Sequence, residues 1–340
     1  MTTRIAINGL GRIGRCVLRA LFDNKESFGN IELVAVNATT PIETLRHIIK
    51  YDSVHGKFAK SVEISENKDA LIVDGKSIKL LAQRDPKTLP WADLKIDVVL
   101  ECTGAFTDKK DAAQHITAGA KKVIISAPAK GEDVKTIVYG VNDDKLAADD
   151  QVISIGSCTT NCIAPIAKIL DATVGIEKGF MTTIHAYTND QNIVDNAHKD
   201  LRRARACALS MIPTSTGAAK AIGLVLPQLA GKLDGGAIRV PTPNVSMIDL
   251  NFIAKKDTSI AEINETIKSA IKSDKKLATV LEYVTEPLVS IDFNHSTFSS
   301  CFDSTQTKVL AKNMVKVCAW YDNEWGFSVR MLDIAKLMKN

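Results

Sequence analysis

The first half of the chain alternates between short apolar runs and amphipathic stretches. The apolar runs are typical of buried strands and lie at 5–7, 31–36, 98–100 and 123–125. Stretches with apolar residues three or four positions apart predict helices at 11–22, 41–49 and 109–118. Two charged, alternating runs predict hairpin strands near 61–65 and 71–81. Strands that alternate with helices at such short spacing predict a parallel sheet covered on both faces.

The second half has longer strand-like runs, which are separated by polar loops. These runs lie at 180–186, 236–240, 247–254, 288–293 and 314–320. Helical patterns lie at 163–170, 260–271 and 325–338. The pattern predicts a mixed or antiparallel sheet with helices on one face, and it places a domain boundary near residue 155.

Composition narrows the class of protein. At 340 residues the chain exceeds the usual size of one hydrophobic core, so we expect two domains. Hydrophobic residues make up 45% and charged residues 24%, which excludes a disordered chain, a fibrous repeat and a membrane protein. The net charge of +4 is too small and too dispersed to indicate a nucleic-acid partner. The N-terminal residues lack the pattern of a signal peptide.

The seven cysteines are scattered along the chain, and the sequence contains no CxxC pair. It therefore predicts neither a metal site nor a disulfide framework. We expect reduced thiols in a cytoplasmic protein.

A glycine-rich turn follows the first predicted strand and opens the first helix. Gly9, Gly11 and Gly14 form the pattern GxGxxG, which binds the pyrophosphate of a dinucleotide at a helix N-terminus. The pattern usually has an acidic residue about 20 positions further on, for the adenosine ribose. No carboxylate stands at the end of the second strand, over 35–40, and this absence bears on which cofactor is used.

Cys158 opens a helix that follows the strand near 152–155. Backbone N–H groups and the dipole at a helix N-terminus stabilise a thiolate, and the polar neighbours of Cys158 argue against a merely buried thiol. Cys162, one turn further on, is expected to be structural. His185 ends an apolar strand and is the candidate general base for Cys158.

Basic and hydroxyl residues gather further along the chain. The basic run 201–205 precedes the hydroxyl–glycine turn 213–220, which enters a helix, and Arg239 ends a strand. The basic run alone fits a solvated face or a nucleic-acid patch. Its place between two hydroxyl-rich loops favours bound phosphate groups.

These motifs together resemble the phosphorylating glyceraldehyde-3-phosphate dehydrogenases over essentially the whole chain, from residue 3 to about 338. The segments that carry the resemblance are SCTTNC, TTIHAYTNDQ, HKDLRRARA, PTSTGAAKA, RVPTPNVS and WYDNEWGFS. The resemblance implies an NAD(P)-binding Rossmann domain over 1–156 and an α+β catalytic domain over 157–322. A C-terminal helix over 323–340 would return to the Rossmann domain. It also implies a homotetramer in which the segment near 180–205 approaches a neighbouring subunit and its cofactor.

The resemblance also implies roles for individual residues. Cys158 would attack the aldehyde of glyceraldehyde 3-phosphate and His185 would act as the base, with NAD or NADP as oxidant and inorganic phosphate as acyl acceptor. The substrate phosphate and the attacking phosphate would be held by Ser157, Thr159, Thr188, Arg203, Thr216, Gly217 and Arg239. The cofactor would contact Gly9, Gly11, Arg12, Ile13, Gly14, Asn37, Ala38, Arg84, Thr103, Gly104, Ser126 and Asn323. Such an enzyme works in glycolysis or gluconeogenesis, with no nucleic acid required.

The sequence departs from the family pattern at the adenosine ribose. Ala38 stands where members that use NAD carry aspartate, and Asn196 and Ala197 stand where they commonly carry Leu-Pro. A carboxylate repels a 2′-phosphate, so its absence removes the main barrier to NADP. Thr39 and Thr40 are further candidate donors to that phosphate, and we expect the enzyme to accept NADP.

Two alternatives remain open from the sequence. Erythrose-4-phosphate dehydrogenases share the cysteine, the histidine and the fold, but they release an acid by hydrolysis and tend to lack the STGAAKA turn, which is intact at 215–221. A non-catalytic NAD-binding or RNA-binding scaffold on the same fold would be indicated by loss of Cys158 or His185, and both residues are present.

Overall fold

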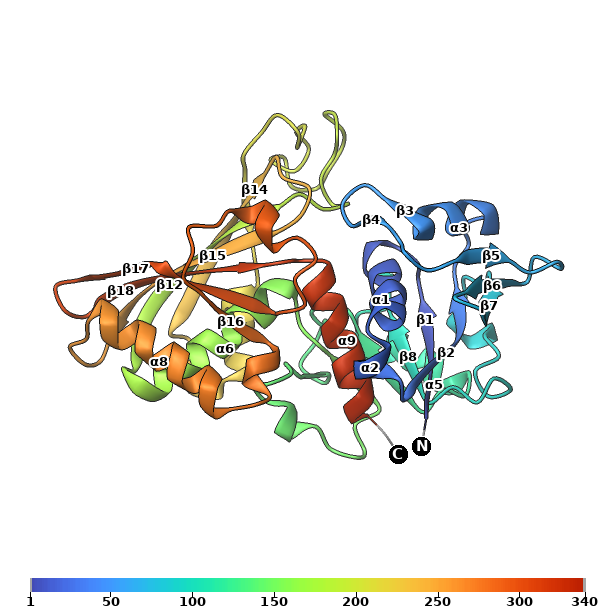
Figure 1. The fold of residues 1–340 in the computed structure, drawn as a ribbon, viewed down its shortest axis with the longest axis horizontal. Coiled ribbons are helices and arrows are strands. Elements are labelled where there is room, and N and C mark those ends of the chain that lie inside the picture. The colour runs from blue at the N-terminus through green and yellow to red at the C-terminus, as the bar shows by residue number, and fades with distance from the viewer. Residues whose placement is uncertain (1, 339–340) are drawn as a thin grey trace. The chain divides into compact units, whose positions relative to one another are not determined.

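The computed structural model describes residues 2–338, which form two compact units (Figure 1). The first unit contains the described residues up to Tyr139, the segment Asp143–Gly156 and the described residues from Phe327 onward. The second contains Gly140–Asn142 and Ser157–Gly326. Within the described residues, no helix combines the length and the apolar character that crossing a membrane requires.

The first unit is built on a nine-stranded sheet whose central strands are parallel. Its order is β10 (Lys135–Thr136), β11 (Val152–Ser154), β9 (Lys122–Ile125), β8 (Val98–Glu101), β1 (Thr3–Asn8), β2 (Ile31–Asn37), β7 (Lys76–Leu81), β6 (Ala70–Val73) and β5 (Val62–Ile64). The pairs β5–β6 and β6–β7 are antiparallel and form the edge of the sheet beside β2. The predicted parallel sheet is present, and a strand lies in the run near 61–65, but the run 71–81 forms two paired strands, β6 and β7, because the chain turns at Asp74 and Gly75.

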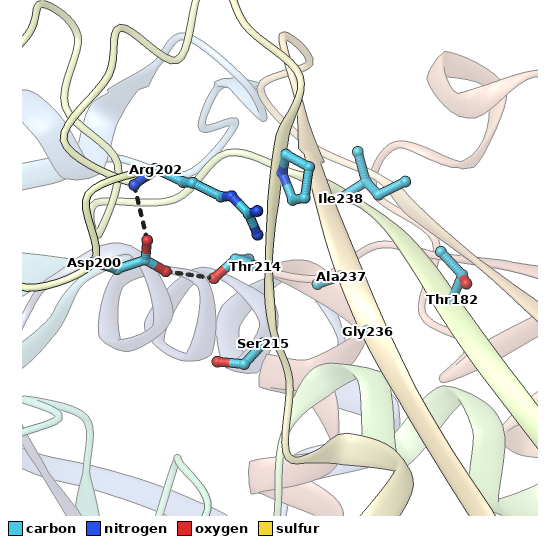
Figure 2. Close-up of a pocket in the computed structure, with 9 residues that line it drawn as sticks. Thr182, Asp200, Arg202, Thr214, Ser215, Gly236, Ala237 and Ile238 are labelled. Carbon is cyan, nitrogen blue, oxygen red and sulfur yellow. Dashed lines mark hydrogen bonds between the residues drawn. The ribbon is translucent and has the colours of Figure 1, made fainter.

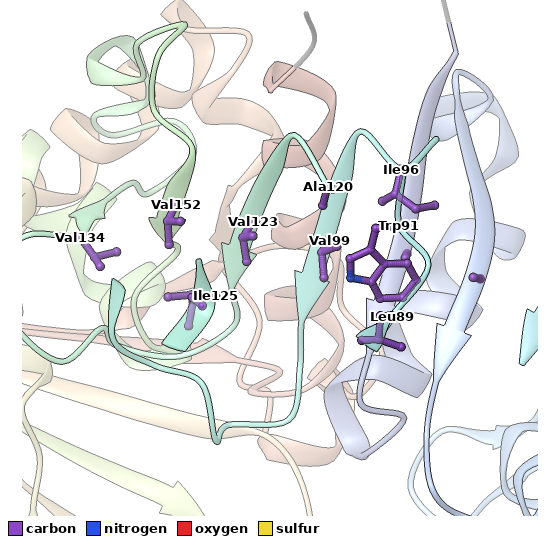
Figure 3. Packing of buried hydrophobic residues seen from close by; sticks show 12 residues of the cluster. Leu89, Trp91, Ile96, Val99, Ala120, Val123, Ile125, Val134 and Val152 are labelled. Carbon is purple, nitrogen blue, oxygen red and sulfur yellow. The ribbon is translucent and has the colours of Figure 1, made fainter. Parts of the chain in front are cut away.

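Helices and apolar side chains complete this unit. The helices are α1 (Arg12–Asp23), α2 (Lys25–Phe28), α3 (Ile42–Lys50), α4 (Lys109–Ala112), α5 (Gln114–Thr117) and most of α9 (Trp325–Leu337). A small hairpin, β3 (Tyr51–Asp52) with β4 (Gly56–Lys57), follows α3. Trp91 packs with Val99, Val123 and Ile125 of the central strands in a fully buried cluster (Figure 3). Burial on this scale explains why β8 and β9 are apolar at nearly every position.

The order of the strands reverses on either side of β1. The chain goes from β1 to β2 and β7 in one direction, and then returns to β8, β9 and β11 in the other. Open parallel sheets bind ligands at such a switch point, beyond the carboxyl ends of the strands. The ends of β1 and β8 are therefore where a cofactor is expected, and the glycine turn begins there at Gly9.

The second unit is built on a seven-stranded mixed sheet (Figure 1). Its order is β13 (Ile212–Ser215), β14 (Leu233–Val240), β12 (Ile176–Ala186), β15 (Ser246–Ala254), β18 (Met314–Tyr321), β17 (Ser300–Leu310) and β16 (Leu281–Val284). The pairs β12–β14 and β16–β17 are parallel, and the other pairs are antiparallel. This arrangement confirms the mixed sheet predicted from the sequence.

Three helices cover this sheet. They are α6 (Cys158–Thr173), α7 (Ala218–Val225) and α8 (Ile260–Ser273). The central helix, α6, packs on β12, β15, β17 and β18, and it contacts both other helices. Nearly all of its residues from Thr159 to Leu170 are buried, so the helix is apolar around most of its surface.

Two other local predictions were wrong. The run 288–293, expected to be a strand, contains a short 3₁₀ helix, Ser290–Phe293, because the Asp292 carboxylate accepts the Val289 N–H at 2.8 Å and turns the backbone. The single helix expected over 109–118 is two short helices, α4 and α5, separated at Ala113.

Candidate active site

Cys158 is the first residue of α6, and the residue before it caps the helix. The Ser157 hydroxyl oxygen accepts the backbone N–H of Thr160 at 3.0 Å, and the extended backbone of Ser157 ends the preceding segment. All seven cysteines are free thiols, and Cys158 is the one that is partly exposed, whereas the other six are buried. The structure therefore presents Cys158, and not Cys162, as the accessible thiol.

His185 lies beside this thiol. The Cys158 sulfur and the His185 Nε2 atom are 3.6 Å apart. His185 Nδ1 lies 2.7 Å from the Ala186 carbonyl oxygen and 2.5 Å from Arg239 Nη1, and Nε2 is the ring nitrogen that faces the sulfur. The Tyr321 ring meets the imidazole edge to face, with the ring centroids 5.9 Å apart. The ring thus has the orientation that a general base for the thiol requires.

The electrostatic environment keeps both groups neutral at rest. Burial, together with the positive charge of Arg239, lowers the pKa of His185 to about 3. Burial raises the pKa of the Cys158 thiol, while Arg239 and hydrogen bonds at the start of α6 act in the opposite direction. The helix N-terminus that the sequence predicted to stabilise a thiolate is present, but burial outweighs it. A thiol that is neutral at rest needs a neighbouring base in order to attack an electrophile.

Arg239 reaches the same place from the neighbouring strand. The parallel register of β12 and β14 pairs His185 with Arg239, and Arg239 Nη1 donates to the Ala186 carbonyl oxygen at 3.0 Å. Within the described chain, the buried Nε atom of Arg239 has no hydrogen-bond partner. An unpaired buried N–H beside the thiol is a donor suited to an anionic group of a substrate.

Thr159 and Thr183 share a partner that the sequence did not indicate. The Tyr321 hydroxyl lies 2.9 Å from Thr159 Oγ1 and 2.8 Å from Thr183 Oγ1, and all three residues are buried. The Thr159 hydroxyl, expected at a phosphate, is therefore engaged with Tyr321. The sequence indicated a role for Tyr321 only by placing a polar hydroxyl at the end of an apolar strand. Its partner Thr159 is 162 positions away, so no local motif joins the two residues.

Further candidate phosphate residues lie around the start of α7. Gly217 caps this helix, a Cβ added there would meet open space, and the first turn of α7 contains no acidic residue. The Thr216 hydroxyl oxygen accepts the Ala218 N–H at 3.2 Å. This open helix start is suited to an anion. Thr188 lies in the segment that follows β12, and its hydroxyl donates to the Gln191 side chain at 3.2 Å.

Arg203 is engaged with nearby side chains. Its Nε atom donates to Thr214 Oγ1 at 2.7 Å, and its Nη1 atom pairs with Asp190. Thr214 in turn donates to Asp200 at 3.1 Å, beside a pocket that β13 and β14 line (Figure 2). Binding of a phosphate by Arg203 would therefore require its exchange with Asp190.

The glycine turn of the first unit fits a dinucleotide. Gly9 has a φ of +93°, and a Cβ there would lie 2.7 Å from the Thr103 side chain. A Cβ at Gly14 would lie 2.0 Å from the Gly9 carbonyl oxygen, whereas Gly11 faces open space. No side chain caps α1, and its first turn has no acidic residue. Its backbone N–H groups, including that of Ile13, are therefore available to a pyrophosphate.

Arg12, expected near the pyrophosphate, forms a two-pronged ion pair with Asp52. Burial raises the pKa of Asp52, but Arg12 and the backbone N–H groups of Val54 and His55 outweigh burial and hold that pKa well below its usual range. Arg12 is thus fixed at the start of α1.

The ends of the central strands carry a buried polar network that the sequence did not reveal. Glu101, at the end of β8, accepts Asn8 Nδ2 at 2.6 Å and the Thr103 N–H at 2.7 Å, and it lies 3.1 Å from His115. Asn37 donates to Asn8 at 2.7 Å. The network ties together the strand ends at the switch point, and with them the turn at Thr103 and Gly104.

Three further candidate cofactor residues lie in three loops of this unit, after β2, β7 and β9: Ala38, Arg84 and Ser126. Ala38 is half-buried, and its backbone N–H donates to the Leu81 carbonyl oxygen at 2.9 Å. The backbone N–H of Ser126 donates to the Glu101 carbonyl oxygen, and Arg84 is exposed.

Comparison with known proteins agrees with this division of the chain. Residues 3–109 match the profile of the glyceraldehyde 3-phosphate dehydrogenase NAD binding domain, and residues 157–323 match that of the C-terminal domain. The chain is 56% identical over 338 residues to glyceraldehyde-3-phosphate dehydrogenase of Xanthobacter flavus, with 99% of both chains covered. It is 54% identical over 336 residues to that of Geobacillus stearothermophilus, with 98% of both covered.

The fold and these matches define the chain as an NAD-dependent oxidoreductase with a Rossmann domain and a mixed-sheet catalytic domain. It belongs to the glyceraldehyde-3-phosphate dehydrogenase family. The resemblance and the fold class inferred from the sequence are therefore confirmed.

Proposed function

We propose that the chain is a phosphorylating glyceraldehyde-3-phosphate dehydrogenase of glycolysis or gluconeogenesis. It oxidises D-glyceraldehyde 3-phosphate to 1,3-bisphosphoglycerate with NAD or NADP and inorganic phosphate. The observation that carries the proposal is the 3.6 Å contact between the Cys158 sulfur and His185 Nε2, with Arg239 alongside. An assay of cofactor reduction that requires both the aldehyde and phosphate tests it.

His185 moves the protons of the covalent steps. As the Cys158 sulfur bonds to the aldehyde carbon, Nε2 takes the thiol proton and passes it to the carbonyl oxygen, which becomes a hydroxyl. A nicotinamide bound beside that carbon would supply the hydride acceptor. Nε2 takes the hydroxyl proton as the C=O bond re-forms, which leaves a thioester on Cys158. An oxygen of inorganic phosphate then bonds to the acyl carbon and the C–S bond breaks, which releases the acyl phosphate, and the leaving sulfur takes back the proton held on Nε2 to restore the thiol.

Two groups of residues are suited to the two phosphate groups of this reaction. We assign the substrate's C3 phosphate to Arg239 and Thr188, since Arg239 has a buried N–H without a partner in the described chain. We assign the attacking phosphate to the start of α7 at Thr216 and Gly217, together with Ser157, Thr159 and Arg203. The open start of α7 supports phosphate rather than water as acyl acceptor, and so favours this function over erythrose-4-phosphate dehydrogenase.

We propose that the adenosine site accepts NADP as well as NAD. The proposal rests on Ala38 at the end of β2, and on Asn196 and Ala197, which are exposed. With aspartate at position 38, a 2′-phosphate would meet a like charge, and the ribose diol would gain hydrogen bonds. The sequence assigns no arginine to a 2′-phosphate, so we propose use of both cofactors.

Ala38→Asp is expected to shift the ratio of kcat/KM for NAD to that for NADP toward NAD by roughly tenfold or more, since 1.4 kcal/mol is a factor of ten. The kcat/KM values for NAD and for NADP are measured on one preparation of each protein. Ala148→Asp is the matched control, because it adds the same charge in an exposed loop, and it should leave the ratio unchanged. A wild-type enzyme that prefers NAD by several hundredfold would refute the proposal.

We also propose a homotetramer. Several large apolar side chains of the segment 193–211 are 70% to 88% exposed in the isolated chain: Ile193, Val194, Leu201, Leu209 and Met211. Such a patch on one segment is typical of a surface that another subunit covers. The seven free cysteines support a reducing, cytoplasmic location.

A further inference from the structure

Ser246 is a buried hydroxyl at the start of β15, and it joins two parts of the candidate active site. Its Oγ atom accepts the backbone N–H of Ala186 at 3.0 Å and lies 2.8 Å from Asn323 Oδ1. Ser246 is 1% exposed and Asn323 5% exposed. The serine therefore has no access to solvent. It contacts Asn323, which the family resemblance assigns to the carboxamide of the nicotinamide.

The direction of this chain of hydrogen bonds is fixed at one end. A backbone N–H only donates, so the Ser246 oxygen must accept from Ala186. The hydroxyl proton then remains, and it points to Asn323 Oδ1. The opposite end of the amide, Nδ2, must face away from the serine. Among residues 2–338, no group forms a hydrogen bond with this Nδ2 atom.

The backbone beside Asn323 is also held in place. The Asp322 carboxylate accepts the N–H groups of Glu324 at 2.9 Å and Trp325 at 2.7 Å, and it accepts the His295 N–H at 2.7 Å. The side-chain torsions are thus the freedom that remains to Asn323, and the Ser246 contact restricts them.

We propose that Ser246 is a positioning residue that sets the amide of Asn323, so that the site recognises the carbonyl oxygen of the nicotinamide carboxamide. Without the hydroxyl, the amide turns freely between its donor and acceptor ends. An amide that presents its oxygen repels the carboxamide oxygen, so the affinity for the nicotinamide half falls. The inference rests on the proposed function, because it takes Asn323 as the nicotinamide contact.

Binding, measured by calorimetry on the full-length enzyme, tests the inference without turnover. NAD is compared with ADP-ribose, which has the same adenosine and pyrophosphate but lacks the nicotinamide. Ser246→Ala is expected to weaken the binding of NAD by about tenfold, which is the size of one hydrogen bond to a ligand. The affinity for ADP-ribose should stay within about twofold of wild type. Ser246→Thr keeps a hydroxyl and should restore most of the NAD affinity.

Two further variants separate positioning from loss of stability. Ser300→Ala removes another fully buried hydroxyl of the same sheet, which contacts Cys162 and not Asn323, and it should not change the ratio of the two affinities. Asn323→Asp keeps an oxygen that accepts from Ser246 but replaces the Nδ2 donor by a second oxygen. It should weaken the binding of NAD and leave that of ADP-ribose unchanged. An unchanged ratio in Ser246→Ala, or an equal change in Ser300→Ala, overturns the inference. If wild type binds NAD no more tightly than ADP-ribose, the assignment of Asn323 to the nicotinamide fails instead.

Discussion

Cys158→Ser is expected to lower turnover by roughly 10⁴-fold or more, while the affinity for cofactor stays nearly the same. Serine keeps the place at the start of α6, but its hydroxyl ionises far less readily than a thiol. The neutral His185, whose pKa of about 3 makes it a weak base, is unable to generate an alkoxide. Steady-state rates and a cofactor titration on the same preparation measure both effects.

Cys162→Ala is the matched control, since this buried thiol lies one turn further along the same helix and should be dispensable for turnover. Labelling of the wild-type enzyme with iodoacetamide should reach Cys158 first and inactivate the enzyme. Preferential labelling of the buried Cys102 or Cys301, with activity retained, would show that the nucleophile has been assigned wrongly.

His185→Asn is expected to slow both acylation and hydride transfer by roughly 10²–10⁴-fold, which is the usual range for loss of a general base. The structure places Nε2 at 3.6 Å from the sulfur, and asparagine has no basic nitrogen to offer there. Rapid-mixing measurements of a single turnover separate this effect from cofactor binding. Near wild-type single-turnover rates in the variant would mean that another group takes the thiol proton.

The catalytic pair was predictable because each member has a local signature. Cys158 follows a strand and precedes a helix among small polar residues, and the structure shows the expected cap at Ser157. His185 ends an apolar strand, and the structure brings it to the thiol. The Rossmann domain was predictable for the same reason, because a buried parallel strand is apolar at nearly every position.

Other features depend on contacts between distant parts of the chain. Tyr321, Ser246 and the Glu101–His115 pair are buried polar groups whose partners lie on other strands or helices, so no spacing along the sequence announces them. The strand β17 was not predicted, because most of its residues are polar and its few apolar residues do not alternate with them. Burial in the folded chain likewise raises the pKa of the Cys158 thiol, and its position at a helix N-terminus, which the sequence shows, does not reveal this.

The central claim is that the acyl group waits on Cys158 until phosphate accepts it, and a single-turnover experiment tests this claim most directly. The wild-type enzyme is mixed with glyceraldehyde 3-phosphate and excess cofactor in a buffer without phosphate, and the absorbance of the reduced cofactor is followed. We expect a burst of one reduced cofactor per Cys158, then near silence, and steady turnover once inorganic phosphate is added. Steady turnover to the free acid without phosphate, or the absence of any burst, would contradict the account.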